Sequence, residues 1–201
     1  MLSSRLGDPA SPCAAPGRAA ERDMVTTMPT PPFITELRSL VGHRLLWLST
    51  ASAVVLDDEG HVLLGRRADT GGWALPGGII DPAAQPADAA VRECFEETGV
   101  VVVPELLTSV TVSQPKIYAN GDQVQYLGLT FRCRPVGGAA CVNDEESLEV
   151  RWHALDALPE LDEGELGPLT QALKSDSAAA YSFSGLLVSP ASGQSPGPGR
   201  R

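Results

Sequence analysis

The chain has 201 residues, a hydrophobic fraction of 43% and a formal net charge of −10 at pH 7. This length predicts one domain of ordinary size with tails, and no apolar run approaches the roughly 20 residues that span a bilayer. An acidic chain without a concentrated basic patch repels long nucleic acids, so we expect neither a nucleic acid polymer nor a membrane as partner. A small anionic ligand stays compatible if a metal ion or a local basic group offsets the repulsion.

The cysteines and the N-terminus bear on the compartment. No C-x-x-C pair occurs, so neither a zinc site nor a disulfide framework is expected from Cys13, Cys94, Cys133 and Cys141. The first residues lack the apolar segment of about 7 to 15 residues that marks a secretory signal. We therefore expect a cytoplasmic protein.

Both ends of the chain differ in composition from its centre. Residues 1–30 are rich in Pro, Ala and small polar residues and predict a disordered leader. Residues 176–201 predict a flexible Gly/Ser/Pro-rich tail, in which the apolar stretch 181–188 is a candidate strand or partner contact. The globular domain is therefore expected within residues 31–175. Three methionines are alternative starts: Met1, Met24 and Met28.

The first elements of the domain are predicted to be strands. The apolar, β-branched run from Leu46 to Leu56 and the run from His61 to Arg66 flank a turn at residues 57–60, which predicts a hairpin. A short apolar segment from Trp73 to Leu75 follows, and it is closed by Pro-Gly-Gly at residues 76–78.

The clearest helix runs from Gln85 to Thr98, because this segment contains no Gly, has Pro86 near its start and stops at Gly99. Later apolar runs predict three strands and two short helices: Val100–Val112, Gln123–Arg134, Ser147–His153, Leu155–Leu158 and Glu163–Leu173. Strands interrupted by helices indicate an α/β layered domain.

Three carboxylates are crowded on the predicted helix. Separations of three and four residues place Glu93, Glu96 and Glu97 on neighbouring parts of one face. Like charges at this spacing oppose each other by a few tenths of a kcal/mol per pair, and a divalent cation is the strongest compensator. Hard oxygen ligands suit Mg²⁺ or Mn²⁺. The alternative is a solvated acidic helix face, which is the commoner explanation for an isolated E-x-x-E-E string.

The segment from Gly78 to Val100, GIIDPAAQPADAAVRECFEETGV, resembles the Nudix box G-x5-E-x7-R-E-U-x-E-E-x-G-U, where U is a bulky aliphatic residue. The matching positions are Gly78, Arg92, Glu93, Glu96, Glu97, Gly99 and Val100. Six are fixed identities, which chance would supply about once per 10⁷ starting positions. The resemblance covers roughly half the chain. It implies an α/β/α sandwich with a mixed β-sheet between helices, with Gly78, Arg92 and Gly99 as structural residues.

Two positions depart from the signature. Cys94 stands where Ile, Leu or Val is usual, and Cys behaves as a small hydrophobe. Ala84 stands where the first Glu is expected, a residue that in the family braces the loop by pairing with the box arginine, here Arg92. Asp81, three residues earlier, is a candidate replacement for that partner. We expect weakened activity and a loop that is less well ordered.

The resemblance also implies a mechanism. Glu93, Glu96 and Glu97 would hold Mg²⁺, with Mn²⁺ as an alternative and a backbone carbonyl near Gly77 or Gly78 as a further ligand. Water would be the nucleophile, and the general base would come from the box or from a later loop. The later candidates are Glu145, Glu146 and Glu149, of which we select Glu146 as catalytic.

Substrate contacts are predicted at two places. Arg66 and Arg67 are candidates for binding a phosphate or a carboxylate, although a surface role or a pair with Asp69 explains them equally well. Lys116 and Tyr118 lie in a segment able to stack a base, for which a plain hairpin loop is the alternative.

The leading hypothesis is a metal-dependent diphosphohydrolase acting on a small nucleotide-like diphosphate, such as ADP-ribose, a dinucleotide, a nucleotide sugar or a nucleoside triphosphate. Ala84 motivates an alternative, a Nudix-fold domain that binds a nucleotide in regulation and turns it over weakly or not at all. A prenyl diphosphate isomerase is a third option without supporting residues. Family members often dimerise, so a homodimer is compatible with the resemblance.

Overall fold

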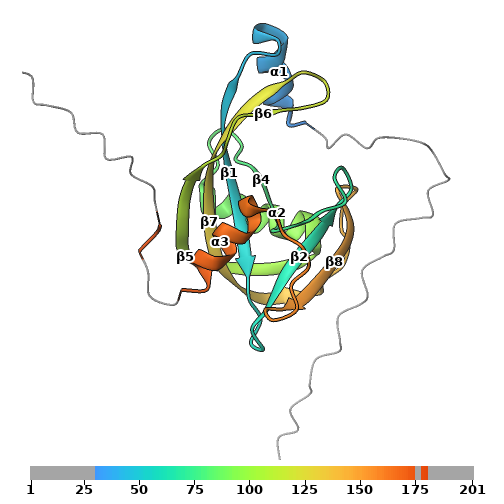
Figure 1. The fold of residues 1–201 in the computed structure, drawn as a ribbon, viewed down its shortest axis with the longest axis vertical. Coiled ribbons are helices and arrows are strands. Elements are labelled where there is room, and N and C mark those ends of the chain that lie inside the picture. The colour runs from blue at the N-terminus through green and yellow to red at the C-terminus, as the bar shows by residue number, and fades with distance from the viewer. Residues whose placement is uncertain (1–29, 175–177, 181–201) are drawn as a thin grey trace, which may run out of the picture.

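The computed structural model describes residues 30–174 and 178–180 of the chain (Figure 1). The predicted leader up to residue 29, and the predicted tail apart from 178–180, lie outside the described residues. In chain order the elements are α1 (Pro32–Val41), β1 (Leu46–Val55), β2 (His61–Arg67), β3 (Trp73–Ala74), β4 (Gly77–Ile79), α2 (Pro86–Thr98), β5 (Val100–Val112), β6 (Lys116–Ile117), β7 (Gln123–Gly138), β8 (Ser147–Ala154) and α3 (Glu163–Ala172).

The strands form two sheets. The larger has the order β4-β1-β7-β5, with β6 paired to β7, and the smaller has the order β3-β2-β8. β1 runs parallel to β7 and antiparallel to β4, so the larger sheet is mixed. β2 runs antiparallel to both of its neighbours.

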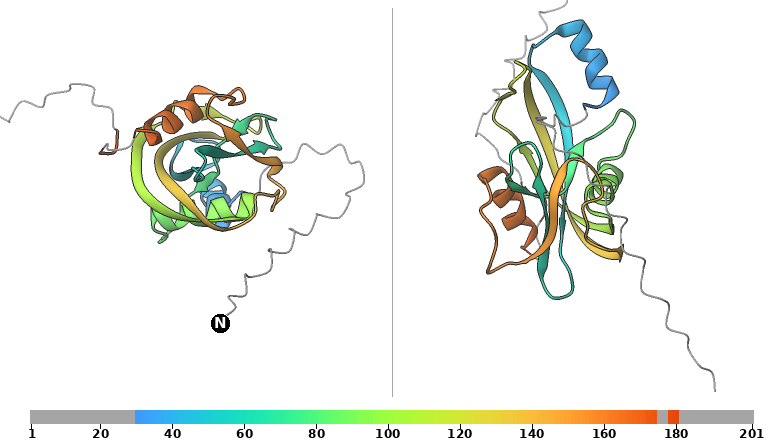
Figure 2. Two further views of the ribbon diagram at one scale, coloured as in Figure 1. Left: turned by 90° about the horizontal axis from the view of Figure 1, so that it is seen from below. Right: turned by 90° about the vertical axis from the view of Figure 1, so that its right-hand side faces the viewer.

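Helices cover the sheets from opposite sides (Figure 2). Alternate residues of a strand point to opposite faces, and β1 is buried on both of them. Ala53 packs in a core with Ala90 and Cys94 of α2, whereas Val54 packs in a second core with Leu169 of α3. This arrangement is the predicted α/β/α sandwich with a mixed sheet.

Helix α2 connects β4 to β5, and residues at its two ends determine where it begins and stops. Pro86 occupies its first turn, where a missing N–H costs nothing. Gly99 ends it in the left-handed conformation with φ of 69°, and the Gly99 N–H donates to Phe95 O at 2.9 Å. Cys94 is fully buried, consistent with its use as a small hydrophobe, and burial raises the pKa of its thiol to about 12.

The predicted hairpin of β1 with β2 is wrong. The chain does turn at residues 57–60, where the Asp57 N–H donates to His61 O at 3.0 Å, but within the described residues the strand pairing goes no further than an isolated bridge between Leu56 and Val62. Both edges of β1 are already taken by β4 and β7, so β2 pairs instead with β3 and β8.

Two further differences concern helices. The predicted helix from Leu155 to Leu158 is a turn, because four residues followed by Pro159 cannot sustain one. Helix α1 was not predicted; it begins at a proline, buries Ile34 and lies beside the β6–β7 hairpin, where Arg38 Nη2 donates to Gln123 O at 2.8 Å (Figure 1).

The last described residues lie against the edge of the larger sheet. The Ala180 N–H donates to Thr108 O at 2.9 Å, and the Val110 N–H donates to Ala180 O at 3.0 Å, which makes a parallel bridge to β5. None of the helices in the described ranges combines the length and apolar character needed to cross a bilayer.

Candidate active site

Two glycines bring strand β4 into direct contact with the acidic face of α2. A Cβ on Gly78 would lie 2.5 Å from Glu93 Cδ, and a Cβ on Gly77 would lie 2.6 Å from Ala51 O. The Gly77 N–H donates to Glu97 Oε1 at 3.1 Å. A side chain at residue 78 would therefore displace the Glu93 carboxylate, whereas one at residue 77 would collide with the backbone of the neighbouring strand β1.

Arg92 gathers three carboxylates around its guanidinium. Its Nη2 lies 2.8 Å from Glu93 Oε1 and 3.2 Å from Asp81 Oδ2, while its Nη1 lies 2.7 Å from Glu96 Oε2. Asp81 thus pairs with Arg92 in place of the glutamate that Ala84 replaces, as the sequence suggested. Ala84 stays in the loop through its backbone, because its N–H donates to Asp81 O at 3.0 Å.

The loop between β4 and α2 contains a strained residue. Ala83 has φ of 70°, and it is the only non-glycine residue with positive φ in the described part of the chain. The left-handed conformation brings Cβ too close to the following carbonyl oxygen in any residue but glycine. The family commonly has Pro-Gly-Glu here, so Ala83 occupies the usual glycine position.

The inner carboxyl groups of α2 resist ionisation. Burial raises the pKa of Glu93 to about 6, although the charge of Arg92 opposes the rise. Burial also raises the pKa of Glu97 well above its ordinary value, against the Gly77 N–H bond and with added repulsion from Glu93, Asp144 and Glu146. Without a cation, the nearby positive charges therefore do not balance the negative charges of Glu93 and Glu97.

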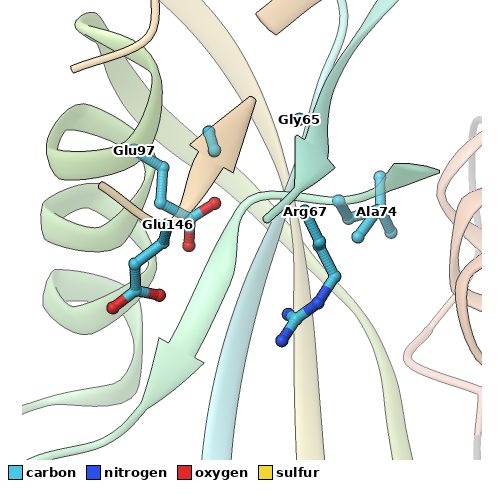
Figure 3. A pocket seen from close by; sticks show the side chains of 7 residues that line it. Gly65, Arg67, Ala74, Glu97 and Glu146 are labelled. Atoms are coloured by element: carbon cyan, nitrogen blue, oxygen red, sulfur yellow. The ribbon is translucent and has the colours of Figure 1, made fainter. Parts of the chain in front are cut away.

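Residues from the loop before β8 face the same space. Figure 3 shows the carboxylates of Glu97 and Glu146 on one side of a small cavity and the side chain of Arg67 on the other. The cavity has a volume of about 10 Å³, room for a single water molecule, and Ser147 also lines it. Burial and the nearby Asp144 raise the pKa of Glu146, while Arg67 opposes the rise.

The three later glutamates differ in their surroundings. Glu146 lines the cavity, whereas Glu145 is exposed and Glu149 is ion-paired with Arg151. The Glu146 loop is held by its backbone, because Glu146 O accepts the Ala68 N–H at 2.8 Å. Among these candidates, the structure brings only Glu146 to the box.

The two predicted arginines are separated by the alternation of β2. Arg67 lines the cavity with Glu97 and is ion-paired with Asp69 at 2.7 Å. Arg66 points to the other face, where it lines a larger hollow of about 540 Å³ with the loop 70–73 and the segment 159–162.

Lys116 and Tyr118 lie on the β6–β7 hairpin, and their contact with a substrate stays a prediction. The Tyr118 hydroxyl is hydrogen-bonded to the Tyr126 hydroxyl at 2.9 Å.

Two acidic residues near the box were missed by the sequence analysis. The negative charge of Asp144 helps to raise the pKa of Glu97. The sequence could have indicated this residue, because it directly precedes the candidate glutamates at 145 and 146. Glu165 on α3 accepts the Leu75 N–H at 2.9 Å across a separation of 90 residues, for which a single sequence carries no signal.

The donor set at α2 fits a hard divalent cation in chemistry, since all of its ligand atoms are carboxylate or carbonyl oxygens. In the structure, however, Glu93 and Glu96 are drawn onto Arg92.

The compact group of three ligand atoms found within the described ranges, all within 4.8 Å of one another, lies elsewhere, at Asp57, Glu59 and His61. That group is explained by turn closure, because Asp57 Oδ1 accepts the N–H of Glu59 at 3.0 Å and of His61 at 2.7 Å.

Comparisons with known proteins agree with this geometry. A NUDIX domain model matches residues 47–173. A MutT-like protein of Streptomyces ambofaciens is 36% identical over 111 residues, which make up 55% of this chain and 66% of that protein. A putative 8-oxo-dGTP diphosphatase of Bacillus subtilis is 30% identical over 114 residues, 57% of this chain and 71% of that protein. The crystal structure of a MutT NUDIX hydrolase from Burkholderia pseudomallei has a TM-score of 0.53 at 27% identity, covering 63% of this chain and 98% of that one.

An α/β/α sandwich that holds a glutamate-rich helix against a glycine-lined strand defines the class, a Nudix-type fold. Because the family model spans residues 47–173 of the 201, the chain belongs to the Nudix hydrolase family.

Proposed function

We propose that this chain hydrolyses a diphosphate linkage in a nucleoside diphosphate derivative, with Mg²⁺ or Mn²⁺ held by Glu93, Glu96 and Glu97. The observation that carries the proposal is the undercompensated negative charge at the inner carboxylates, where burial raises the pKa of both Glu93 and Glu97. Four acidic side chains in mutual electrostatic contact beside a water-sized cavity are unfavourable for stability alone and suited to a cation.

The carbonyl of Gly77 is a candidate further ligand, because this residue already contacts the carboxylate of Glu97. A bound divalent cation supplies charge neutralisation on the phosphate oxygens and lowers the pKa of water. To hold a cation, Glu93 and Glu96 would turn away from Arg92 in part, and Asp81 would remain as the partner of the guanidinium.

Glu146 is the proposed general base. It faces the cavity that Glu97 lines, and its raised pKa lies closer to neutrality than that of an ordinary glutamate. Glu146 accepts the proton of the attacking water, and Arg67 on the opposite wall offers positive charge to the substrate phosphates.

A small nucleotide derivative is the proposed partner. The relative from Bacillus subtilis carries a name that assigns it an oxidised guanine nucleotide, which supports a nucleotide substrate here. The domain is proposed to occupy residues 31–175, and the cytoplasmic location and the homodimer stay predictions.

A nucleotide-binding domain with weak or absent turnover is the second candidate. The observation that favours it is Arg92, whose contacts with Glu93 and Glu96 spread the carboxylates around a guanidinium instead of converging them on one point.

One experiment separates these functions. The full chain is incubated with ADP-ribose, nucleotide sugars, dinucleotides and nucleoside triphosphates over a range of Mg²⁺ and Mn²⁺ concentrations, and phosphate products are measured. We expect cation-dependent cleavage that falls at least about 100-fold in Glu97→Gln. The matched control is Asp88→Asn, an exposed carboxylate on the same helix, which leaves turnover unchanged. Nucleotide-induced thermal stabilisation without cleavage would instead support the binding domain.

A further inference from the structure

The segment that leads to Glu146 is fastened to the last turn of α2. The Asn143 N–H donates to Glu97 O at 3.3 Å, and the Asn143 side chain donates from Nδ2 to Phe95 O at 3.0 Å. Glu97 O is among the last four carbonyl oxygens of the helix, which have no acceptor role inside it. The segment therefore starts from a fixed point on the helix that carries the box glutamates.

Strand β2 fixes the other end of the same segment. Glu146 O accepts the Ala68 N–H at 2.8 Å. Directly after Glu146, Arg67 pairs with Ser147, one residue out of register with the rest of the β2–β8 pair. Such a bulge changes the direction of the side chains next to it. The chain at Glu146 thus does not follow the regular alternation of β8.

Between these two points, Asp144 closes a tight turn. Its Oδ1 accepts the Glu146 N–H at 3.0 Å and the Ser147 N–H at 3.2 Å. An Asp side chain that bonds the backbone two and three residues further on stabilises a turn. The backbone of Glu146 is consequently held on both sides, with its N–H on Asp144 and its C=O on Ala68. From this position its carboxylate lies on the same side of the cavity as that of Glu97 (Figure 3).

The placement of a general base decides how well it works. The base must come within hydrogen-bond reach of the proton that it accepts. A misplacement of about 1 Å can cost on the order of 100-fold in rate. The cavity beside Glu146 has a volume of about 10 Å³, so a shift of the Glu146 backbone would move the carboxylate relative to the one water that fits there.

We propose that Asp144 is a positioning residue for catalysis, which holds the backbone of Glu146 so that the carboxylate of the proposed base faces the water-sized cavity. The inference rests on the proposed function, because that function assigns Glu146 the role of general base. Asp144 then acts through Glu146 and touches neither the cation nor the substrate.

The test compares two substitutions of Asp144 in the full chain by steady-state kinetics, on a substrate of the panel that the wild type cleaves. We expect Asp144→Ala to lower kcat by about 10- to 100-fold with KM unchanged. Asp144→Asn keeps an amide oxygen that accepts both N–H groups, and its kcat is expected to stay within about 3-fold of the wild type. The matched control is Glu145→Ala, which removes an exposed neighbouring carboxylate and keeps the wild-type kcat.

A double-variant cycle with Glu146→Gln separates positioning from a general loss of structure. If Asp144 acts through Glu146, adding Asp144→Ala to Glu146→Gln lowers kcat by less than about 2-fold. Amide hydrogen exchange gives a readout that does not depend on turnover. The N–H groups of Glu146 and Ser147 are expected to exchange faster in Asp144→Ala than in the wild type or in Asp144→Asn.

Four outcomes would overturn the inference: a wild-type kcat in Asp144→Ala, an equal loss in Asp144→Asn and Asp144→Ala, the same loss with and without Glu146→Gln, or unchanged amide exchange in Asp144→Ala. Failure of the proposed function is a different result. Absence of cation-dependent cleavage by the wild type would remove the hydrolase and the base with it, while the exchange rates still decide whether Asp144 holds the backbone of Glu146.

Discussion

Ala83 stands where the family commonly has glycine, and its backbone conformation is strained as a result. Its φ of 70° lies in the left-handed region, where a non-glycine residue costs about 1–2 kcal/mol. The chain keeps the backbone path of a glycine here although the glycine is missing. The loop that joins β4 to α2 therefore stores strain directly beside the acidic face of α2.

Ala83→Gly is expected to stabilise the protein by about 1 kcal/mol. Glycine removes the strain, although its greater freedom in the unfolded chain offsets part of the gain. The midpoint of thermal or chemical unfolding checks this, with Ala84→Gly as control, since residue 84 has no positive φ and glycine there only loosens the unfolded chain. An unchanged or lower midpoint for Ala83→Gly would contradict the strain assigned to this loop.

Glu93 makes the stability of the metal-free protein depend on pH. Burial raises its pKa from 4.5 to about 6, with Arg92 opposing, so the folded state binds this proton more tightly than the unfolded state does. Its stabilising contribution is complete below about pH 4.5 and is lost as the pH rises through about 6.

We expect the wild type in EDTA to lose stability over this window relative to Glu93→Gln, which carries no ionisable group there. Melting temperatures measured from pH 4 to pH 7 test it, and profiles that stay parallel would show that Glu93 titrates normally.

At the scale of elements, the sequence predicts features that depend on neighbouring residues, such as the ends of a helix, better than the pairing of strands. Helix α2 was placed within one residue of its observed start because Pro86 and Gly99 act within their own turns. The hairpin of β1 with β2 was wrong because a strand's partners depend on which edges are free, and β4 and β7 come from distant sequence. Helix α1 was missed because its proline-rich approach resembles the leader.

The loop before α2 depends on Asp81 as the substitute partner of Arg92. Because both side chains are partly exposed, the pair contributes modestly, and Asp81→Ala is expected to lower kcat/KM by up to about 5-fold. Ala84→Glu in the same chain restores a carboxylate to the loop and is expected to recover the loss. Steady-state kinetics of the single and double variants measure both effects. A double variant with the same kcat/KM as Asp81→Ala would show that a glutamate at residue 84 cannot replace Asp81 as the partner of Arg92.

The loop before β8 carries the proposed base. Glu146→Gln keeps the loop, because its backbone carbonyl holds the Ala68 N–H, but removes the proton acceptor. We expect kcat to fall by about 10²- to 10⁴-fold and the acidic limb of its pH profile to disappear. The same substitution at exposed Glu145 is expected to leave both intact. A retained acidic limb in Glu146→Gln would assign the base to another residue.

For the whole molecule, the fold class and the acidic helix were readable because the box is contiguous in sequence. The assembly around it was not, since Arg67, Asp144, Glu146 and Glu165 come from four separate segments. Arg66 and Arg67, adjacent in sequence, face different hollows because β2 alternates. Only tertiary packing decides which charged residue shares a cavity with the box.

Cation binding by the wild type and by the Glu93→Gln/Glu97→Gln double variant tests the central claim most directly. Mn²⁺ is titrated calorimetrically at pH 7 in the presence of a non-hydrolysable nucleotide, so that the phosphates complete the coordination. We expect saturable uptake by the wild type and at least about a 100-fold weaker affinity in the double variant, which lacks two charged ligands. Equal affinity in the two proteins, or no uptake by the wild type, would contradict a metal site on α2.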